Sequence, residues 1–90
     1  IDDALGSHPA VAEAASFGVP DAQLGEDIVA AVVVAPGATV TPRELRRWLL
    51  DRLSAPKVPR RVWFVDHLPR TPTGKVQRGE LARRWSEEHG

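Results

Sequence analysis

The pattern of apolar and polar positions predicts the first two β-strands of this chain. Between Val11 and Val19 four apolar residues fall on one face at period two, so they should share a face of a sheet. That set is Val11, Ala15, Phe17 and Val19. The segment from Ile28 to Ala35 is apolar throughout, as expected of a central strand buried on both faces. A polar segment from Pro20 to Asp27, with Gly25 as its flexible point, predicts a loop between the two strands.

A third strand is predicted from Arg61 to Asp66. Its apolar side chains alternate, with Val62 and Phe64 on one side and Trp63 and Val65 on the other.

Apolar residues spaced three or four positions apart predict helices around these strands. We expect the end of a helix from Ile1 to Ser7, because Gly6 and then Pro9 are stop signals. A second helix should begin at Thr41, which can cap it, with Pro42 in the first turn and Glu44 completing a capping box. Its apolar stripe comprises Leu45, Trp48, Leu49 and Leu53.

A last helix is predicted from Arg78 to Glu88. Leu81, Ala82 and Trp85 form its apolar face, and Glu80 can pair with Arg84 four residues on. We expect the three tryptophans, Trp48, Trp63 and Trp85, to be core residues rather than stacking platforms. The predicted order is α-β-β-α-β-α, a single α+β domain over residues 1–90 with helices packed on a small three-stranded sheet.

The segment from Leu68 to Arg78, here called the lysine loop, carries the clearest functional signal. It reads LPRTPTGKVQR, so one lysine, Lys75, lies between a predicted strand and a predicted helix. A phosphate-binding P-loop is excluded, because Pro69 and Val76 stand where that motif requires glycine and Ser or Thr. The prolines limit the freedom of the loop, and a lysine ammonium can stabilise charge on a phosphate or a carboxylate. A solvated lysine in a surface turn is the alternative interpretation.

Composition narrows the possible functions. The chain has no net charge and no cysteine, and its three histidines are far apart, so disulfides are excluded and a metal site is not expected. No apolar run is long enough to span a membrane. The basic side chains are concentrated at one end: residues 1–51 carry a net charge of −5 and residues 52–90 a net charge of +5. The basic half suggests an anionic partner or ordinary solvated surface, and without a stripe of exposed aromatic residues it does not favour nucleic acid.

Several segments, in order, resemble the C-terminal domain of adenylate-forming enzymes, the superfamily of acyl-CoA synthetases, luciferases and nonribosomal-peptide adenylation domains. The lysine loop resembles the family's own lysine-bearing loop. The other matching segments are HPAVAEAA from His8, FGVPD from Phe17 with Gly25-Glu26 after it, IVAAVVV from Ile28, and the connector from Leu53 to Arg60.

In that family this small domain is a mobile lid on a large N-terminal domain, which holds most of the ATP and magnesium contacts and the acyl pocket. The resemblance implies a cytoplasmic enzyme that first converts a carboxylic acid and ATP to an acyl-adenylate and then transfers the acyl group to coenzyme A. Lys75 would be the catalytic lysine, with Thr73 and Gly74 beside it in the loop. The spacing of Pro69, Gly74 and Lys75 also resembles the recognition pattern of lysine acetyltransferases. Acetylation of Lys75 would remove its charge.

Two further sets of residues are candidates for ligand contacts. Gly25 and Glu26 would approach the active site after the lid rotates, unless they form a plain surface turn. A rim for the phosphates of coenzyme A could include Arg52, Lys57, Arg60, Arg61 and Arg78, although solvated surface is the simpler reading of any one of them.

Three features limit what the resemblance implies. The family's hinge and N-terminal domain are not in these 90 residues, so we expect a fragment that is inactive alone. Pro56 also stands where the family usually has an aromatic residue.

Two alternatives remain. One is a nonribosomal-peptide adenylation domain, which is disfavoured by Lys57 because those domains usually have methionine at that position. The other is a stand-alone binding module.

Overall fold

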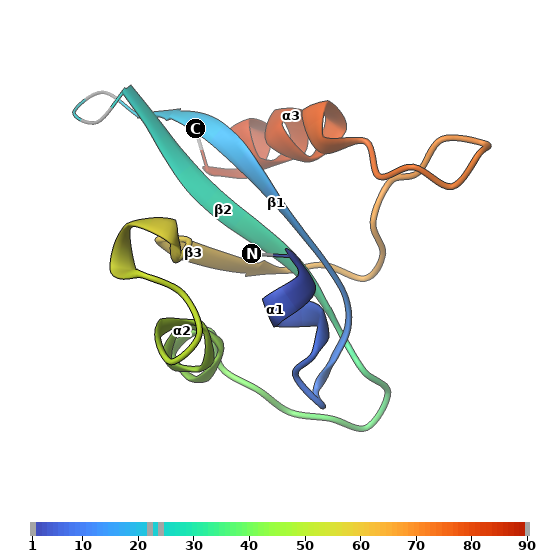
Figure 1. Ribbon diagram of the computed structural model, residues 1–90. Helices are drawn as coiled ribbons and strands as arrows, with labels where there is room; N and C mark the ends of the chain where they lie inside the picture. The colour runs from blue at the N-terminus through green and yellow to red at the C-terminus, as the bar shows by residue number, and fades with distance from the viewer. Residues whose placement is uncertain (1, 22, 24, 90) are drawn as a thin grey trace.

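The computed structural model describes residues 2–21, 23 and 25–89, so Ile1, the first residue of the helix end predicted from Ile1 to Ser7, lies outside the description. Its elements follow the predicted order, with one short 3₁₀ turn, η1, in the connector (Figure 1). They are α1 (Asp2–Gly6), β1 (Val11–Asp21), β2 (Gly25–Val34), α2 (Pro42–Leu50), η1 (Ala55–Lys57), β3 (Arg61–Phe64) and α3 (Arg78–His89). The predicted α+β class with a three-stranded sheet is confirmed.

The sheet has the order β1-β2-β3, with β2 in the centre. β1 pairs with β2 antiparallel and β3 pairs with β2 parallel. The parallel pair is possible because the connection from β2 to β3 runs through α2. This connection is long enough to return the chain to the end of the sheet where β2 begins. Val29, Ala30, Ala31 and Val32 of β2 are all fully buried, which confirms the prediction of a strand covered on both faces.

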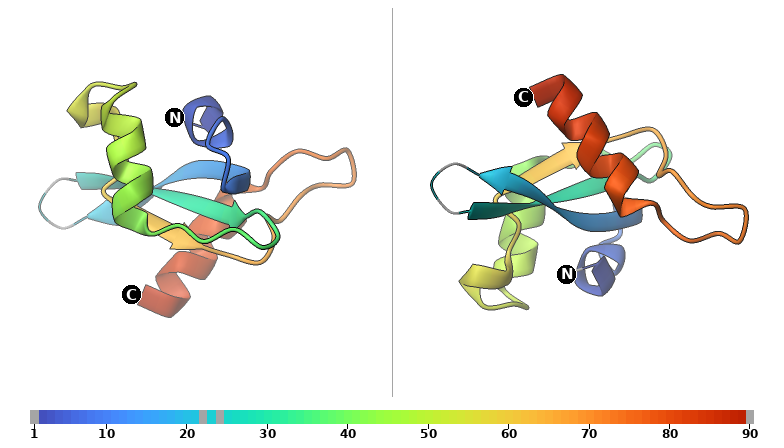
Figure 2. Two further views of the ribbon diagram at one scale, coloured as in Figure 1. Left: turned by 90° about the horizontal axis from the view of Figure 1, so that it is seen from below. Right: turned by 90° about the horizontal axis from the view of Figure 1, so that it is seen from above.

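Helices cover the two faces of the sheet, so the domain has three layers (Figure 2). On one face, Leu5 of α1 and Leu45 and Leu49 of α2 form a core with Ala30 and Val32. On the other face, Leu81 of α3 packs with Phe17, Val29, Ala31 and Leu68. As expected, the three tryptophans pack against these cores: Trp48 against the first, and Trp63 and Trp85 against the second. Among the described residues, no helix is both long enough and apolar enough to cross a membrane.

The predicted single face of β1 is wrong at Val11. Val11 belongs to the core beneath α1 and α2, whereas Ala15, Phe17 and Val19 belong to the core beneath α3. The reason is a β-bulge: Val11 pairs with Val34 and Glu13 with Val33, so β1 uses one more residue than β2 there. An extra residue reverses which side chains face each core, and a pattern of period two cannot show it.

The predicted loop from Pro20 to Asp27 is also too long. Val19 pairs with Asp27, Pro20 with Glu26 and Asp21 with Gly25, so both strands continue into this polar segment. Backbone pairing outweighs the weak strand preference of these residues, and Pro20 is tolerated because β1 is an edge strand. β3, by contrast, ends at Phe64 rather than Asp66.

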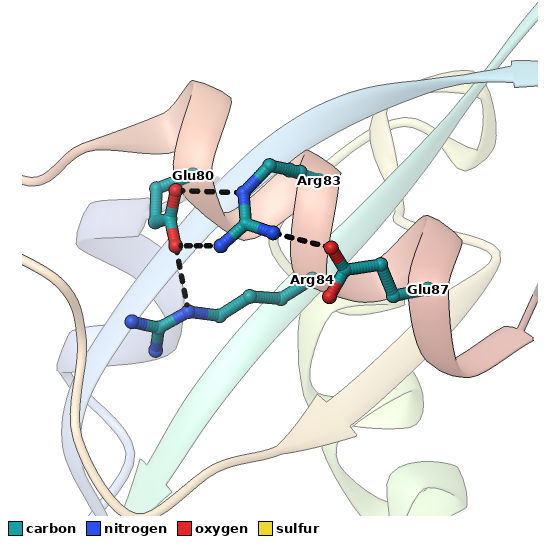
Figure 3. Close-up of polar contacts among 4 residues, drawn as sticks. All are labelled: Glu80, Arg83, Arg84 and Glu87. Atoms are coloured by element: carbon teal, nitrogen blue, oxygen red, sulfur yellow. Dashed lines mark hydrogen bonds and ion pairs between the residues drawn. The ribbon is translucent and has the colours of Figure 1, made fainter.

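The helix starts follow local rules. Thr41 caps α2, since its side-chain oxygen accepts a hydrogen bond of 3.2 Å from the backbone N–H of Glu44. Glu80 lies in the first turn of α3, where the helix dipole favours a negative charge. Glu80 makes the predicted ion pair with Arg84, 3.1 Å from Oε1 to Nε, and also pairs with Arg83, which in turn contacts Glu87 (Figure 3).

These contacts should be visible in the titration of Glu80. Hydrogen bonds from Arg83 and then Arg84 lower the pKa of Glu80 from 4.5 to about 2. A carboxylate with a lowered pKa stabilises the fold above its unfolded-state pKa, and that contribution is lost as the pH falls from 4.5 through about 2. We expect a side-chain NMR titration to place the pKa of Glu80 at about 2, and at about 4.5 when Arg83→Gln and Arg84→Gln are combined. Titration of the wild-type Glu80 at its ordinary value would contradict this.

The lysine loop as a candidate functional site

The lysine loop folds back on itself as an irregular hairpin. Arg70 and Val76 form an isolated antiparallel bridge, and the Gln77 N–H donates to the Pro69 carbonyl at 2.8 Å. At its start the loop is anchored by Leu68 and Pro69, both of which are buried. The remainder extends away from the sheet (Figure 1).

Thr71 and Lys75 close the tip of the loop by binding each other. The Thr71 N–H donates to the Lys75 carbonyl at 2.8 Å, and the Lys75 N–H donates to Thr71 Oγ1 at 3.1 Å. Thr71 Oγ1 also lies 2.9 Å from Thr73 Oγ1, and the Gly74 N–H donates to the Thr71 carbonyl at 2.9 Å. Gly74 has a φ of +90°, a conformation that favours glycine, so the residue before the lysine serves the turn itself.

Lys75 is therefore fixed at its backbone and free at its side chain. Both its N–H and its carbonyl are hydrogen-bonded to Thr71, while the residue is exposed and makes no ion pair with any other residue that the structure describes. Thr73 and Gly74, the other two predicted residues of the loop, are exposed beside it. The arrangement presents one ammonium group, with three donors, on an ordered projection.

Arg70 and Glu13 belong to this site but were missed as functional candidates. Arg70 Nη1 donates to the Gly74 carbonyl at 2.8 Å, and Arg70 Nη2 forms an ion pair with Glu13 of β1. Arg70 was visible within the lysine loop, but its partner lies 57 residues earlier, and no local pattern links the two.

Gly25 and Glu26 lie far from Lys75 in the fold. They begin β2 and belong to the β1–β2 hairpin. Both figures of the whole domain place the turn of this hairpin and the lysine loop at opposite ends of the domain (Figures 1 and 2). The Glu26 side chain rests on Gly18, where an added Cβ would lie 2.8 Å from the Glu26 carboxyl carbon. The domain thus carries two separate groups of candidate residues.

Arg78 is bound within the domain. Its Nη2 lies 2.7 Å from a carboxylate oxygen of Asp2, and its Nη1 donates to the Ser16 carbonyl. Burial alone would raise the pKa of Asp2, but hydrogen bonds from Arg78 and Ser16 outweigh burial and hold it below its usual value. Arg78 therefore joins α1, β1 and the start of α3.

The other predicted basic residues lie in three places. Arg60 and Arg61 line one groove of about 770 Å³ between α2, β3 and the end of α3, together with Arg43, Arg46 and Arg47. Arg46 also donates to the Pro59 carbonyl at 3.2 Å. Arg52 instead lies 3.3 Å over the ring of Trp48, and Lys57 is exposed at the end of η1.

The donor sets indicate which ligands these places can hold. Several guanidinium groups around one groove fit a ligand with more than one phosphate, because arginine binds phosphate through two parallel hydrogen bonds. Within the described part of the chain, no three His, Cys, Asp or Glu side chains are grouped so that they could hold a metal ion.

Comparison with known proteins relates this geometry to a family. The family model of the AMP-binding enzyme C-terminal domain matches residues 1–75. An oxalate–CoA ligase of Arabidopsis thaliana is 41% identical over 98% of the chain and 17% of its own length. The fatty acid–[acyl-carrier-protein] ligase ScoC of Streptomyces coeruleorubidus is 45% identical over 94% of the chain and 16% of its own length.

A solved structure gives the same result for the fold. The crystal structure of an acyl-CoA synthetase from Brucella canis superposes with a TM-score of 0.89 and 44% identity, covering 99% of this chain and 17% of that one. The chain spans about one sixth of the length of these relatives. It belongs to the AMP-binding enzyme C-terminal domain family, as the C-terminal domain of an enzyme in the adenylate-forming superfamily.

Proposed function

We propose that this chain is the mobile lid of an ATP-dependent acyl-CoA synthetase and that Lys75 is its catalytic lysine. The observation that carries the proposal is the exposed ammonium side chain of Lys75 on a backbone held at both its N–H and its carbonyl. A cation placed this way can be delivered to a site on another domain with little loss of conformational entropy on binding.

The chemistry has two steps. A carboxylate oxygen of the acid attacks the α-phosphorus of ATP, a P–O bond breaks, and pyrophosphate leaves. The thiol of coenzyme A then attacks the acyl carbon of the adenylate, loses its proton, and AMP leaves as the thioester forms. In the first step Lys75 neutralises negative charge on the carboxylate and phosphate oxygens. This negative charge builds up in the transition state, where a fixed positive charge stabilises it most.

Rotation of the lid between the two steps is supported by the separation of its candidate groups. The lysine loop lies at one end of the sheet, and the hairpin that carries Gly25 and Glu26 lies at the other (Figures 1 and 2). A rigid domain with two functional ends can serve both steps in one active site only if it turns between them. ATP and magnesium would be bound mainly by the N-terminal domain, and the same exposure that serves catalysis makes Lys75 reachable by a lysine acetyltransferase.

Replacing Lys75 tests this role in the full-length enzyme. We expect Lys75→Ala to slow adenylate formation about 100-fold or more, the usual cost of removing one preorganised charge-stabilising group. Thioester formation from supplied acyl-adenylate should stay within about threefold of wild type. The two half-reactions are followed by ATP–pyrophosphate exchange and by thioester release, with the acid that the enzyme activates best.

Arg83→Gln is the matched control, because Arg83 is an exposed cation of α3 whose partners, Glu80 and Glu87, belong to the same helix. It should leave both half-reactions unchanged. An equal loss of both half-reactions in Lys75→Ala would contradict the assigned role.

Coenzyme A is the proposed acceptor, because Arg60 and Arg61 line a groove with three further arginines and such a set suits its phosphates. A carrier-protein thiol is the second candidate, since one relative is named as an acyl-carrier-protein ligase. We expect Arg60→Gln with Arg61→Gln to raise the KM for coenzyme A roughly tenfold, from loss of charge-assisted hydrogen bonds worth about 1.5 kcal/mol. Adenylate formation should not change. A carrier protein that accepts the acyl group faster than coenzyme A does would favour the second candidate.

The 90 residues alone should not catalyse either step. They provide Lys75 and the basic groove, but the acyl pocket of the proposed enzyme would lie in its N-terminal domain. We expect no ATP–pyrophosphate exchange from the purified chain across a panel of carboxylic acids. Exchange above the background of the Lys75→Ala chain would show that the domain holds a complete site.

A further inference from the structure

Arg70 connects the tip of the lysine loop to the sheet. Its guanidinium group makes two contacts in different directions: one nitrogen pairs with Glu13 of β1, and the other donates to the Gly74 carbonyl at 2.8 Å. The Gly74 carbonyl belongs to the peptide group that leads into Lys75. Arg70 therefore holds that peptide group relative to a strand of the core.

The rest of the loop tip has no comparable link. In the part of the chain that the structure describes, the hydrogen bonds of residues 71–75 all remain within residues 70–75. These bonds give the tip its shape but do not fix its direction relative to the sheet. The direction depends on the two chain connections and on Arg70.

The contact with Glu13 contributes little to the stability of the fold. The Arg70 and Glu13 side chains are 42% and 39% exposed, and an ion pair in that setting is typically worth less than about 1 kcal/mol. Its consequence is geometric, because a planar guanidinium group can hold two acceptors at once in a fixed arrangement.

We propose that Arg70 is a positioning residue for adenylate formation, which orients Lys75 through the Gly74 carbonyl and the ion pair with Glu13. This inference rests on the proposed role of Lys75. A misplacement of about 1 Å can slow a reaction by up to about 100-fold, so a loop that keeps its lysine but loses its direction should lose rate.

The test uses Arg70→Gln in the full-length enzyme. We expect the kcat of ATP–pyrophosphate exchange to fall about tenfold, with the KM for ATP within twofold of wild type and thioester formation from supplied acyl-adenylate unchanged. Glu13→Ala should lower the same kcat by a similar factor, because it removes the ion pair that joins Arg70 to β1, and the remaining bond from Arg70 to Gly74 lies within the loop. Arg83→Gln, which removes an exposed arginine with carboxylate partners elsewhere, should change neither rate.

A second background separates positioning from direct contact with the substrate. In Lys75→Ala enzyme, Arg70→Gln should lower the exchange rate less than twofold further, because there is no lysine left to orient. A further tenfold loss would mean that Arg70 itself touches the reacting groups, which overturns the inference.

Hydrogen exchange measures the order of the loop directly. Hydrogen exchange of the peptide covering residues 69–77 should be faster in Arg70→Gln and unchanged in Arg83→Gln. Unchanged hydrogen exchange in both variants would also overturn the inference.

The results distinguish the two proposals. If Lys75→Ala slows exchange and Arg70→Gln does not, the positioning role fails and the role of Lys75 stands. If Lys75→Ala leaves exchange intact, the proposed function itself fails.

Discussion

The burial of β2 on both faces is the constraint on which the rest of this domain depends. Val29 and Ala31 face the core under α3, and Ala30 and Val32 face the core under α1 and α2. A strand with two apolar faces must be central, which leaves β1 and β3 as the edges. A leucine buried against it, such as Leu45 or Leu81, contributes about 1.5–3 kcal/mol, so the helices are held in place by this strand.

The lysine loop depends on the same arrangement. β3 leads directly to Leu68, which is buried in the core under α3, and Leu81 of α3 is buried in that core a short distance beyond the loop. The two ends of the loop are thereby fixed by apolar packing, while its tip contains only exposed or half-buried residues. A close-packed interior transmits position accurately, so the backbone at both ends of the loop moves with the domain as a whole.

In the folded state, ion pairs form between the acidic and the basic half of the chain. Glu13 pairs with Arg70 and Asp2 pairs with Arg78, and each pair links the acidic N-terminal half to the basic C-terminal half. The pairs use the two arginines of the lysine loop, one on either side of Lys75. Lys75 makes no such pair among the described residues, so it is left as the unpaired positive charge of the loop.

The sequence by itself determined the element order, the central strand, the cap of α2 by Thr41 and the choice of Lys75 as the candidate residue. Each of these depends on neighbouring residues: an apolar run, a capping pattern, or a lysine that follows two prolines and precedes a helix. Tertiary structure decided the bulge that moves Val11 to the other core, the extension of both strands through Pro20 and Glu26, and the contact of Arg70 with Glu13. These features come from pairing between segments distant in sequence, and a local pattern contains no information about which distant backbone or carboxylate will lie alongside it.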